Sequence, residues 1–124
     1  MLKRVLIVED SEACAETLQI ALESVPGIET RVIHSAGLVF AAMRDSAVEI
    51  AAVLTDLNMP QSDGFDLIRQ LRAEPRFARL PILLISGDSD PRLPEKALAQ
   101  GADAFFPKPY SPSAVRKKLE QLLC

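Results

Sequence analysis

Five short apolar runs recur along the chain with helical stretches between them, and this alternation constrains the fold more than any other feature. The runs cover residues 5–8, 30–33, 51–54, 82–85 and 104–106. Strands that alternate with helices form βα units, and such units build a parallel sheet. The first, third and fourth runs are apolar throughout, as in strands that helices cover on both faces, so we expect them at the centre of the sheet.

Apolar residues at helical spacing predict a helix in each of the five intervals that follow these runs. In the first helix, Cys14, Leu18, Ala21, Leu22 and Val25 form one stripe that ends at Pro26-Gly27. The other four helices are predicted from Leu38, Ala41 and Ala42; from Phe65, Ile68 and Leu71; from residues 94–100, which end at Gly101; and from Pro112, Val115, Leu119 and Leu122, after Ser111.

These ten elements leave no linker, repeat or low-complexity segment, so we expect a single domain over residues 1–124. The predicted class is α/β, a three-layer αβα sandwich around a five-stranded parallel sheet. The flavodoxin-like strand order 2-1-3-4-5 is one of two common solutions, and periodicity alone does not choose between them.

The composition excludes several classes of protein. The net charge of −3 disfavours a nucleic-acid partner, and the basic run Arg116-Lys117-Lys118 is too short to change that. No segment approaches the roughly 18 apolar residues of a membrane span. Cys14 and Cys124 suggest no disulfide framework. We therefore expect a cytoplasmic protein without a membrane or nucleic-acid partner.

Polar residues follow four of the apolar runs: Glu9-Asp10, Asp56, Ser86 and Lys108. The carboxyl ends of parallel strands share one edge of the sheet, where ligands bind, so these side chains should converge. Three carboxylates repel one another unless a cation neutralises them, and an oxygen-lined pocket suits Mg²⁺. The pattern therefore indicates a Mg²⁺-dependent phosphoryl-acceptor site.

Each residue also has a purely structural interpretation. The acidic pair before Ser11 is favourable at a helix N-terminus, where serine caps the helix and carboxylates stabilise its first turn. A serine before Gly87 is common in turns, and a lone lysine at a strand end usually reaches solvent. We interpret His34, the only histidine, as structural.

Taken together, these residues resemble the receiver domain of two-component response regulators, and the resemblance covers the whole chain. The resemblance rests on four sequence motifs that occur in this order: Glu9-Asp10; Asp56 with Asn58-Met59-Pro60 and Asp63-Gly64; Ser86-Gly87; and Lys108-Pro109. Glu9 replaces the commoner aspartate. Members of this family have the strand order 2-1-3-4-5.

The resemblance implies a role for each residue of the predicted site. Asp10 and Asp56 would bind Mg²⁺ directly, Glu9 through water and Asn58 through its backbone carbonyl. Asp56 would be the nucleophile that forms an acyl phosphate. Lys108 and Ser86 would contact the phosphoryl oxygens, and the Lys108-Pro109 bond would be cis.

The resemblance also implies a switch. Ser86 would move toward the phosphoryl group while Phe105 turns inward, which would remodel the surface of the fourth helix, fifth strand and fifth helix. Phe105 stands where the family often has tyrosine, so it has no hydroxyl to hydrogen-bond in either position.

The predicted function is that of a receiver, not an enzyme acting on other molecules. It would take phosphate from a histidine kinase or histidine phosphotransfer protein onto Asp56, signal by binding a downstream protein, and slowly dephosphorylate itself. Such a receiver could stand alone or belong to a longer regulator or hybrid kinase. We expect a monomer, although charge pairs across a dimer face are conceivable for Arg92, Lys96, Asp103 and Lys117.

Three alternatives are open. The first is a degenerate receiver that serves as a phosphorylation-independent interaction module, although none of the site residues is missing. The second is an aspartyl phosphatase, but Asn58 provides no second acid near the nucleophile. The third is a flavin-binding protein, but no Ser/Thr/Gly-rich loop follows the first run.

Overall fold

The protein is a three-layer αβα sandwich, seen in a computed structural model that describes residues 2–44, 47–59 and 62–123. A five-stranded parallel sheet forms the middle layer. Its strands are β1 (Lys3–Val8), β2 (Ile28–Ile33), β3 (Glu49–Asp56), β6 (Ile82–Ser86) and β7 (Ala104–Pro107). They lie in the order β2-β1-β3-β6-β7.

This order confirms the predicted 2-1-3-4-5 arrangement, because β6 and β7 are the fourth and fifth strands of the main sheet. The labels differ since a small antiparallel ladder of β4 (Asn58–Met59) and β5 (Ser62–Asp63) follows β3. The sequence pattern did not predict this ladder. Pro60, which belongs to the predicted motif, lies outside the described residues. Pro107 lies on the edge strand β7, where a missing ladder donor is tolerated.

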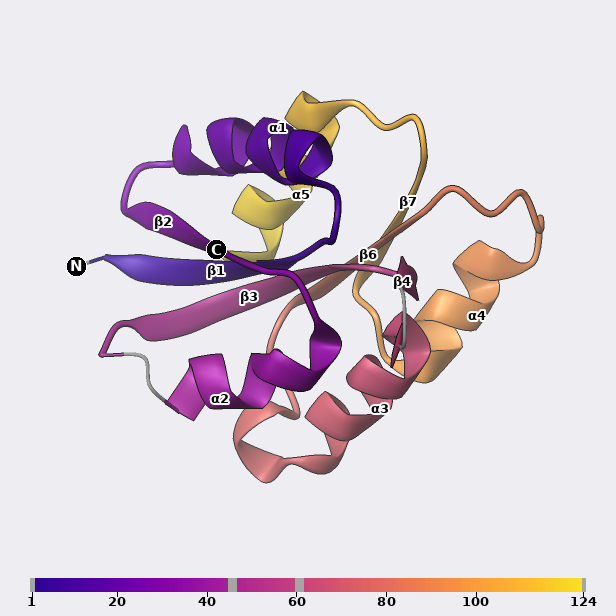
Figure 1. The fold of residues 1–124 in the computed structure, drawn as a ribbon, viewed down its shortest axis with the longest axis horizontal. Helices are drawn as coiled ribbons and strands as arrows, with labels where there is room; N and C mark the ends of the chain where they lie inside the picture. Colours follow the sequence, from indigo (N-terminus) through magenta and orange to yellow (C-terminus); the bar gives the residue numbers. More distant parts are fainter. Residues whose placement is uncertain (1, 45–46, 60–61, 124) are drawn as a thin grey trace.

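Helices cover both faces of the sheet (Figure 1), and the described residues form five α-helices. The helices α1 (Glu12–Glu23) and α5 (Pro112–Leu123) lie on one face, and α2 (Val39–Arg44), α3 (Gly64–Ala73) and α4 (Leu93–Gln100) lie on the other. Short 3₁₀ helices at Ala36–Leu38 and Pro75–Phe77 precede α2 and follow α3. No helix among the described residues is long and apolar enough to cross a membrane.

Two hydrophobic clusters, one on each face, explain why the central strands are apolar throughout. In β1, Val5 and Ile7 pack with α1 and α5, whereas Leu6 and Val8 pack with α2, α3 and α4. Successive side chains of a strand point to opposite faces, so a strand covered on both sides buries every residue.

Local signals fix the helix ends. The Ser11 hydroxyl accepts a hydrogen bond from the Cys14 amide at 3.4 Å at the start of α1, and the Asp63 carboxylate accepts one from the Phe65 amide at 2.8 Å at the start of α3. Gly101 has φ of 111°, so it adopts the left-handed conformation that ends α4, as predicted.

Two details of the predicted helices are wrong. Helix α1 ends at Glu23, and Val25 lies beyond it in a turn whose amide bonds to the Leu22 carbonyl at 3.1 Å. Leu38, expected to mark the second helix, lies in the 3₁₀ helix before α2 and is 58% exposed. Ser35 caps a 3₁₀ helix there, and this changes the angular phase of the following turn, so that Val39 and Met43 become buried instead.

Three of the four charges considered for a dimer face bind within their own chain. Arg92 and Lys96 lie 3.5 and 3.7 Å from carboxylate oxygens of Asp90, and Asp103 pairs with Arg72 at 3.0 Å. The Arg72 guanidinium also donates to backbone carbonyls before β6 and at the end of α4. These contacts tie α3 to the start of β7.

Replacing Gly64 by alanine should destabilise the protein, because a Cβ there would lie 2.8 Å from both the Asp56 carbonyl oxygen and the Leu57 Cα. We expect the free energy of unfolding to fall by about 1–3 kcal/mol, the usual cost of overpacking. At Gly37 a Cβ would meet only the Ser35 hydroxyl, at 3.6 Å, so Gly37→Ala should cost little. Equal stability of the two variants in urea denaturation would contradict this account.

Candidate functional site

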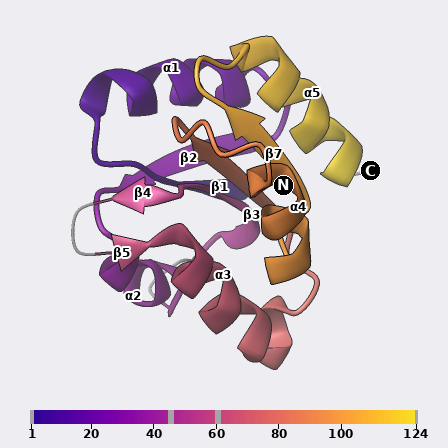
Figure 2. The same ribbon diagram turned by 90° about the vertical axis from the view of Figure 1, so that its right-hand side faces the viewer.

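The predicted site residues converge at the carboxyl edge of the sheet, the edge that Figure 2 faces. Glu9 and Asp10 follow β1, Asp56 and Ser86 end β3 and β6, and Lys108 follows β7. Asp56 is 4% exposed and Glu9 is fully buried, whereas Asp10 is exposed. The ends of four strands that are separated in sequence thus supply one polar cluster.

Lys108 bridges the two buried carboxylates. Its Nζ lies 2.8 Å from Asp56 Oδ2 and 3.4 Å from Glu9 Oε1. Burial alone would lower the pKa of Lys108, but the hydrogen bond to Asp56 and the charges of Asp56 and Glu9 outweigh it and raise that pKa. The lysine is therefore a fixed positive charge at this site rather than a proton donor.

The charged form of Glu9 is destabilised, because this carboxylate is buried and lies close to that of Asp56. Burial, and then the charge of Asp56, raise the pKa of Glu9 from 4.5 to about 6, although Lys108 acts in the opposite direction. Glu9 Oε2 accepts hydrogen bonds from the amides of Asp10 at 3.0 Å and Ser11 at 3.5 Å. These bonds hold the carboxylate at the end of β1.

The three carboxylates fit a divalent cation. Glu9, Asp10 and Asp56 each offer an oxygen, and these oxygens lie within 4.8 Å of one another. Lys108 balances only part of their charge, and carboxylate oxygens are the ligands that hard cations prefer. The Asn58 amide donates to Asp56 Oδ1 at 3.1 Å, so the Asn58 backbone runs beside the same carboxylate.

Ser86 is buried, and its hydroxyl oxygen accepts two hydrogen bonds. One comes from the Asn58 side-chain amide at 3.2 Å and the other from the Asp88 backbone amide at 3.0 Å. The sequence reasoning assigned Asn58 only a backbone role and missed its side-chain contact with Ser86. Residue spacing does not reveal such a contact, because it depends on how two loops meet.

Phe105 is partly buried on β7, where it pairs with Leu84 of β6 and packs against the cluster of α2, α3 and α4. The peptide bond between Lys108 and Pro109 is cis, as the resemblance implied. His34 makes a contact that the sequence did not reveal: its Nδ1 donates to the Glu9 carbonyl oxygen at 3.1 Å.

The strand order and the position of the site define a flavodoxin-like α/β protein with an acidic, lysine-bridged cluster at its strand ends. The family model of the response regulator receiver domain matches residues 5–120. The chain therefore belongs to the response regulator receiver family, as the sequence motifs predicted.

Relatives and solved structures agree with this assignment. Chemotaxis protein CheY1 of Helicobacter pylori is 28% identical over 97% of this chain and 96% of its own length. A putative response regulator from Chloroflexus aurantiacus superposes with a TM-score of 0.88 at 25% identity, covering 99% of this chain and 98% of the other. The signal receiver domain of a histidine kinase from Syntrophus aciditrophicus gives 0.84 at 31% identity, over 97% and 89%. The chain is thus a receiver of the CheY type, consistent with two-component signalling.

Binding of a divalent cation should weaken as the pH falls through about 6, because Glu9 then takes up a proton that the cation must displace. We expect Mg²⁺ affinity to fall about tenfold from about pH 7.5 to about pH 5 through Glu9 alone. The chain has no tryptophan to report binding, so calorimetric titration is the suitable measurement. Glu9→Gln should flatten this part of the pH dependence, and an affinity equally pH-dependent in both proteins would contradict it.

Proposed function

We propose that this receiver takes a phosphoryl group from a histidine kinase or a histidine phosphotransfer protein onto Asp56, with Mg²⁺ as its cofactor. The observation that carries the proposal is the buried Asp56 carboxylate, held by Lys108 at 2.8 Å beside two further carboxylates. A structural ion pair would need only one acid and one base. The extra carboxylates are explained by a cation that must be present when phosphate arrives.

In the proposed reaction an Asp56 oxygen attacks phosphorus in line, a new P–O bond forms, and the P–N bond to the donor histidine breaks. The electron pair of that bond stays on the leaving imidazole. Lys108, which holds Asp56 and Glu9, exchanges part of this contact for a phosphoryl oxygen, and Ser86 donates its hydroxyl proton to another. Asp10, Asp56 and the Asn58 carbonyl, with Glu9 by way of water, would hold Mg²⁺, and the ion would supply positive charge for the phosphoryl oxygens.

Release of the Asn58–Ser86 contact links this chemistry to the proposed switch. Ser86 accepts from Asn58 at 3.2 Å, and a move toward the phosphoryl group would break that bond. Phe105 would then turn inward on β7 and alter the α4, β7 and α5 surface, where a downstream protein binds. Hydrolysis of the acyl phosphate by water resets the protein, whose only chemistry is its own modification. We place it in the cytoplasm with its histidine donor.

Incubation with acetyl phosphate and Mg²⁺ should add one phosphoryl group to the protein, measured as intact mass. Asp56→Asn keeps the size of the side chain but loses the nucleophile, so it should gain none. Asp66→Asn, which changes an exposed carboxylate on α3, is the matched control and should react like the wild type. The gain should disappear when Mg²⁺ is chelated.

No mass gain in a folded wild-type protein that binds Mg²⁺ would overturn the proposal. The phosphorylation-independent interaction module would then become the better description. An equal gain in Asp56→Asn would show that a different residue accepts phosphate.

A further inference from the structure

A continuous series of hydrogen bonds joins the Asp56 carboxylate to the start of α4. At the site, the Asn58 backbone amide donates to Asp56 Oδ1 at 3.1 Å, and the Asn58 side-chain amide donates to the Ser86 hydroxyl at 3.2 Å. The Asp88 amide donates to the same hydroxyl at 3.0 Å. Ser86 is fully buried, so its hydroxyl depends on these protein donors.

Beyond Ser86, the series continues through the largely exposed loop of residues 87–92. The Asp88 carboxylate accepts from the Asp90 amide at 2.9 Å, and the Asp90 carboxylate accepts from the Arg92 amide at 2.9 Å. Three consecutive turns thus have the same form, in which a side-chain oxygen accepts from the backbone amide two residues later. Each turn shares a residue with the next, so a change in one turn displaces the acceptor of the next.

Helix α4 relies on this loop for its N-terminus. Arg92, the N-cap residue of α4, makes no side-chain capping hydrogen bond, whereas Ser11 and Asp63 cap α1 and α3 with their own side chains. Asp90 replaces such a cap, because its carbonyl also accepts from the Leu93 amide at 3.1 Å. Asp90 therefore fixes the position at which α4 begins.

Two basic side chains reinforce this last link. Arg92 Nε lies 3.5 Å from Asp90 Oδ1, and Lys96 Nζ, in the first turn of α4, lies 3.7 Å from Asp90 Oδ2. Both basic residues are exposed, and exposed ion pairs contribute little. The backbone amides are thus the main connection between Asp90 and the helix.

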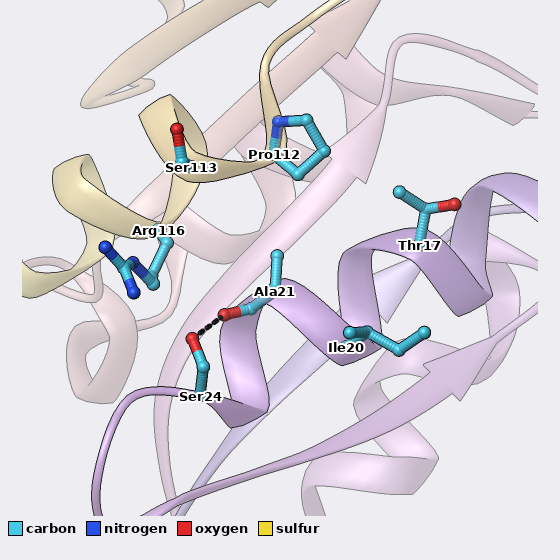
Figure 3. A pocket seen from close by; sticks show the side chains of 7 residues that line it. All are labelled: Thr17, Ile20, Ala21, Ser24, Pro112, Ser113 and Arg116. Carbon is cyan, nitrogen blue, oxygen red and sulfur yellow. Dashed lines mark hydrogen bonds between the residues drawn. The ribbon is translucent and has the colours of Figure 1, made fainter.

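Two other serine hydroxyls make hydrogen bonds that remain local. At the groove between α1 and α5, the Ser24 hydroxyl donates to the Ala21 carbonyl at 2.6 Å (Figure 3). Before α2, the Ser35 hydroxyl accepts from the Gly37 amide at 3.3 Å. Alanine and glycine have no polar side chain, so neither bond leads to a further residue. The loop after Ser86 differs because it has aspartate two and four residues later.

We propose that a hydrogen-bond relay couples the acceptor carboxylate to the start of α4, through Asn58, Ser86, Asp88 and Asp90. When Ser86 turns toward a phosphoryl group, the Asp88 amide loses its acceptor, the following turns loosen, and α4 loses its fixed start. Asp88 and Asp90 are positioning residues, because they act on backbone amides and not on the reacting atoms. The relay rests on the proposed function for its phosphoryl trigger, and it provides a route to α4 that does not pass through Phe105.

Amide hydrogen exchange in the unphosphorylated protein, followed by NMR, tests the relay without phosphoryl chemistry. Ser86→Ala removes the first acceptor, so exchange should become about fivefold faster at three amides, those of Asp88, Asp90 and Arg92. Asp90→Ala should speed exchange at Arg92 and leave Asp88 unchanged. Asp88→Ala should speed exchange at Asp90 and Arg92, whereas Asp88→Asn keeps a side-chain oxygen and should behave like the wild type.

Faster exchange at Asp88 alone in Ser86→Ala would overturn the relay, because the turns would then be independent. Equal exchange in Asp88→Ala and Asp88→Asn would do the same. Ser35→Ala is the matched control, since it removes a capping hydroxyl outside the relay and should leave these amides unchanged. Because the protein is unphosphorylated here, the relay and the phosphoryl chemistry can fail separately.

Exchange after treatment with acetyl phosphate and Mg²⁺ tests whether the relay transmits the signal. Phosphorylation of the wild type should speed exchange across the first turn of α4. Asp88→Ala should gain the same mass as the wild type, since its carboxylate is outside the acidic cluster, but should lose most of the response of α4. Phe105→Leu should keep that response. A response kept in Asp88→Ala and lost in Phe105→Leu would overturn the proposal, as would an unresponsive α4 in phosphorylated wild type.

Discussion

Repulsion among three carboxylates at one edge of the sheet is the constraint on which the rest of the structure depends. Glu9 and Asp56 are buried there, and Asp10 stands beside them at the entrance. Buried like charges are costly unless opposite charge is near. Lys108 supplies one positive charge, and the pKa of Glu9 near 6 shows that this compensation is partial. The acidic cluster is therefore one that could hold a cation, and in the proposed function phosphate would arrive once the cation is present.

Buried strands and backbone hydrogen bonds hold the charged residues of the site in place. Asp56 ends the central strand β3, and Glu9 follows the neighbouring strand β1; both strands have buried side chains on both faces. Behind Asp56, the absence of a side chain at Gly64 lets α3 start against the β3 backbone, where the Gly64 amide bonds to the Leu57 carbonyl at 2.8 Å. The Lys108 amide bonds to the Ser86 carbonyl at 2.8 Å, so the lysine is fixed to the end of β6. Backbone contacts thus fix the relative positions of Asp56, Ser86 and Lys108.

The sequence predicts the parallel α/β class and the converging residues from regular patterns, whereas the strand order is predicted from the resemblance to the receiver family. Strand ends are marked by abrupt changes from apolar to polar residues, and parallel topology then places Asp56 and Lys108 together without knowledge of any contact. What the sequence does not predict depends on irregular backbone. Leu38 is exposed because a 3₁₀ turn shifts the phase of α2. The contacts of Asn58 with Ser86 and of His34 with Glu9 join loops far apart in sequence, and no local pattern encodes them.

The most direct measurement is the chemical location of the phosphoryl group. Borohydride reduces an acyl phosphate on aspartate to homoserine, and peptide mapping then identifies the modified position. The account predicts homoserine at position 56 alone, in protein treated with acetyl phosphate and Mg²⁺. Homoserine at position 10, or a stable phosphate on Ser86 with no homoserine, would contradict it, because the buried carboxylate beside Lys108 would then not be the acceptor.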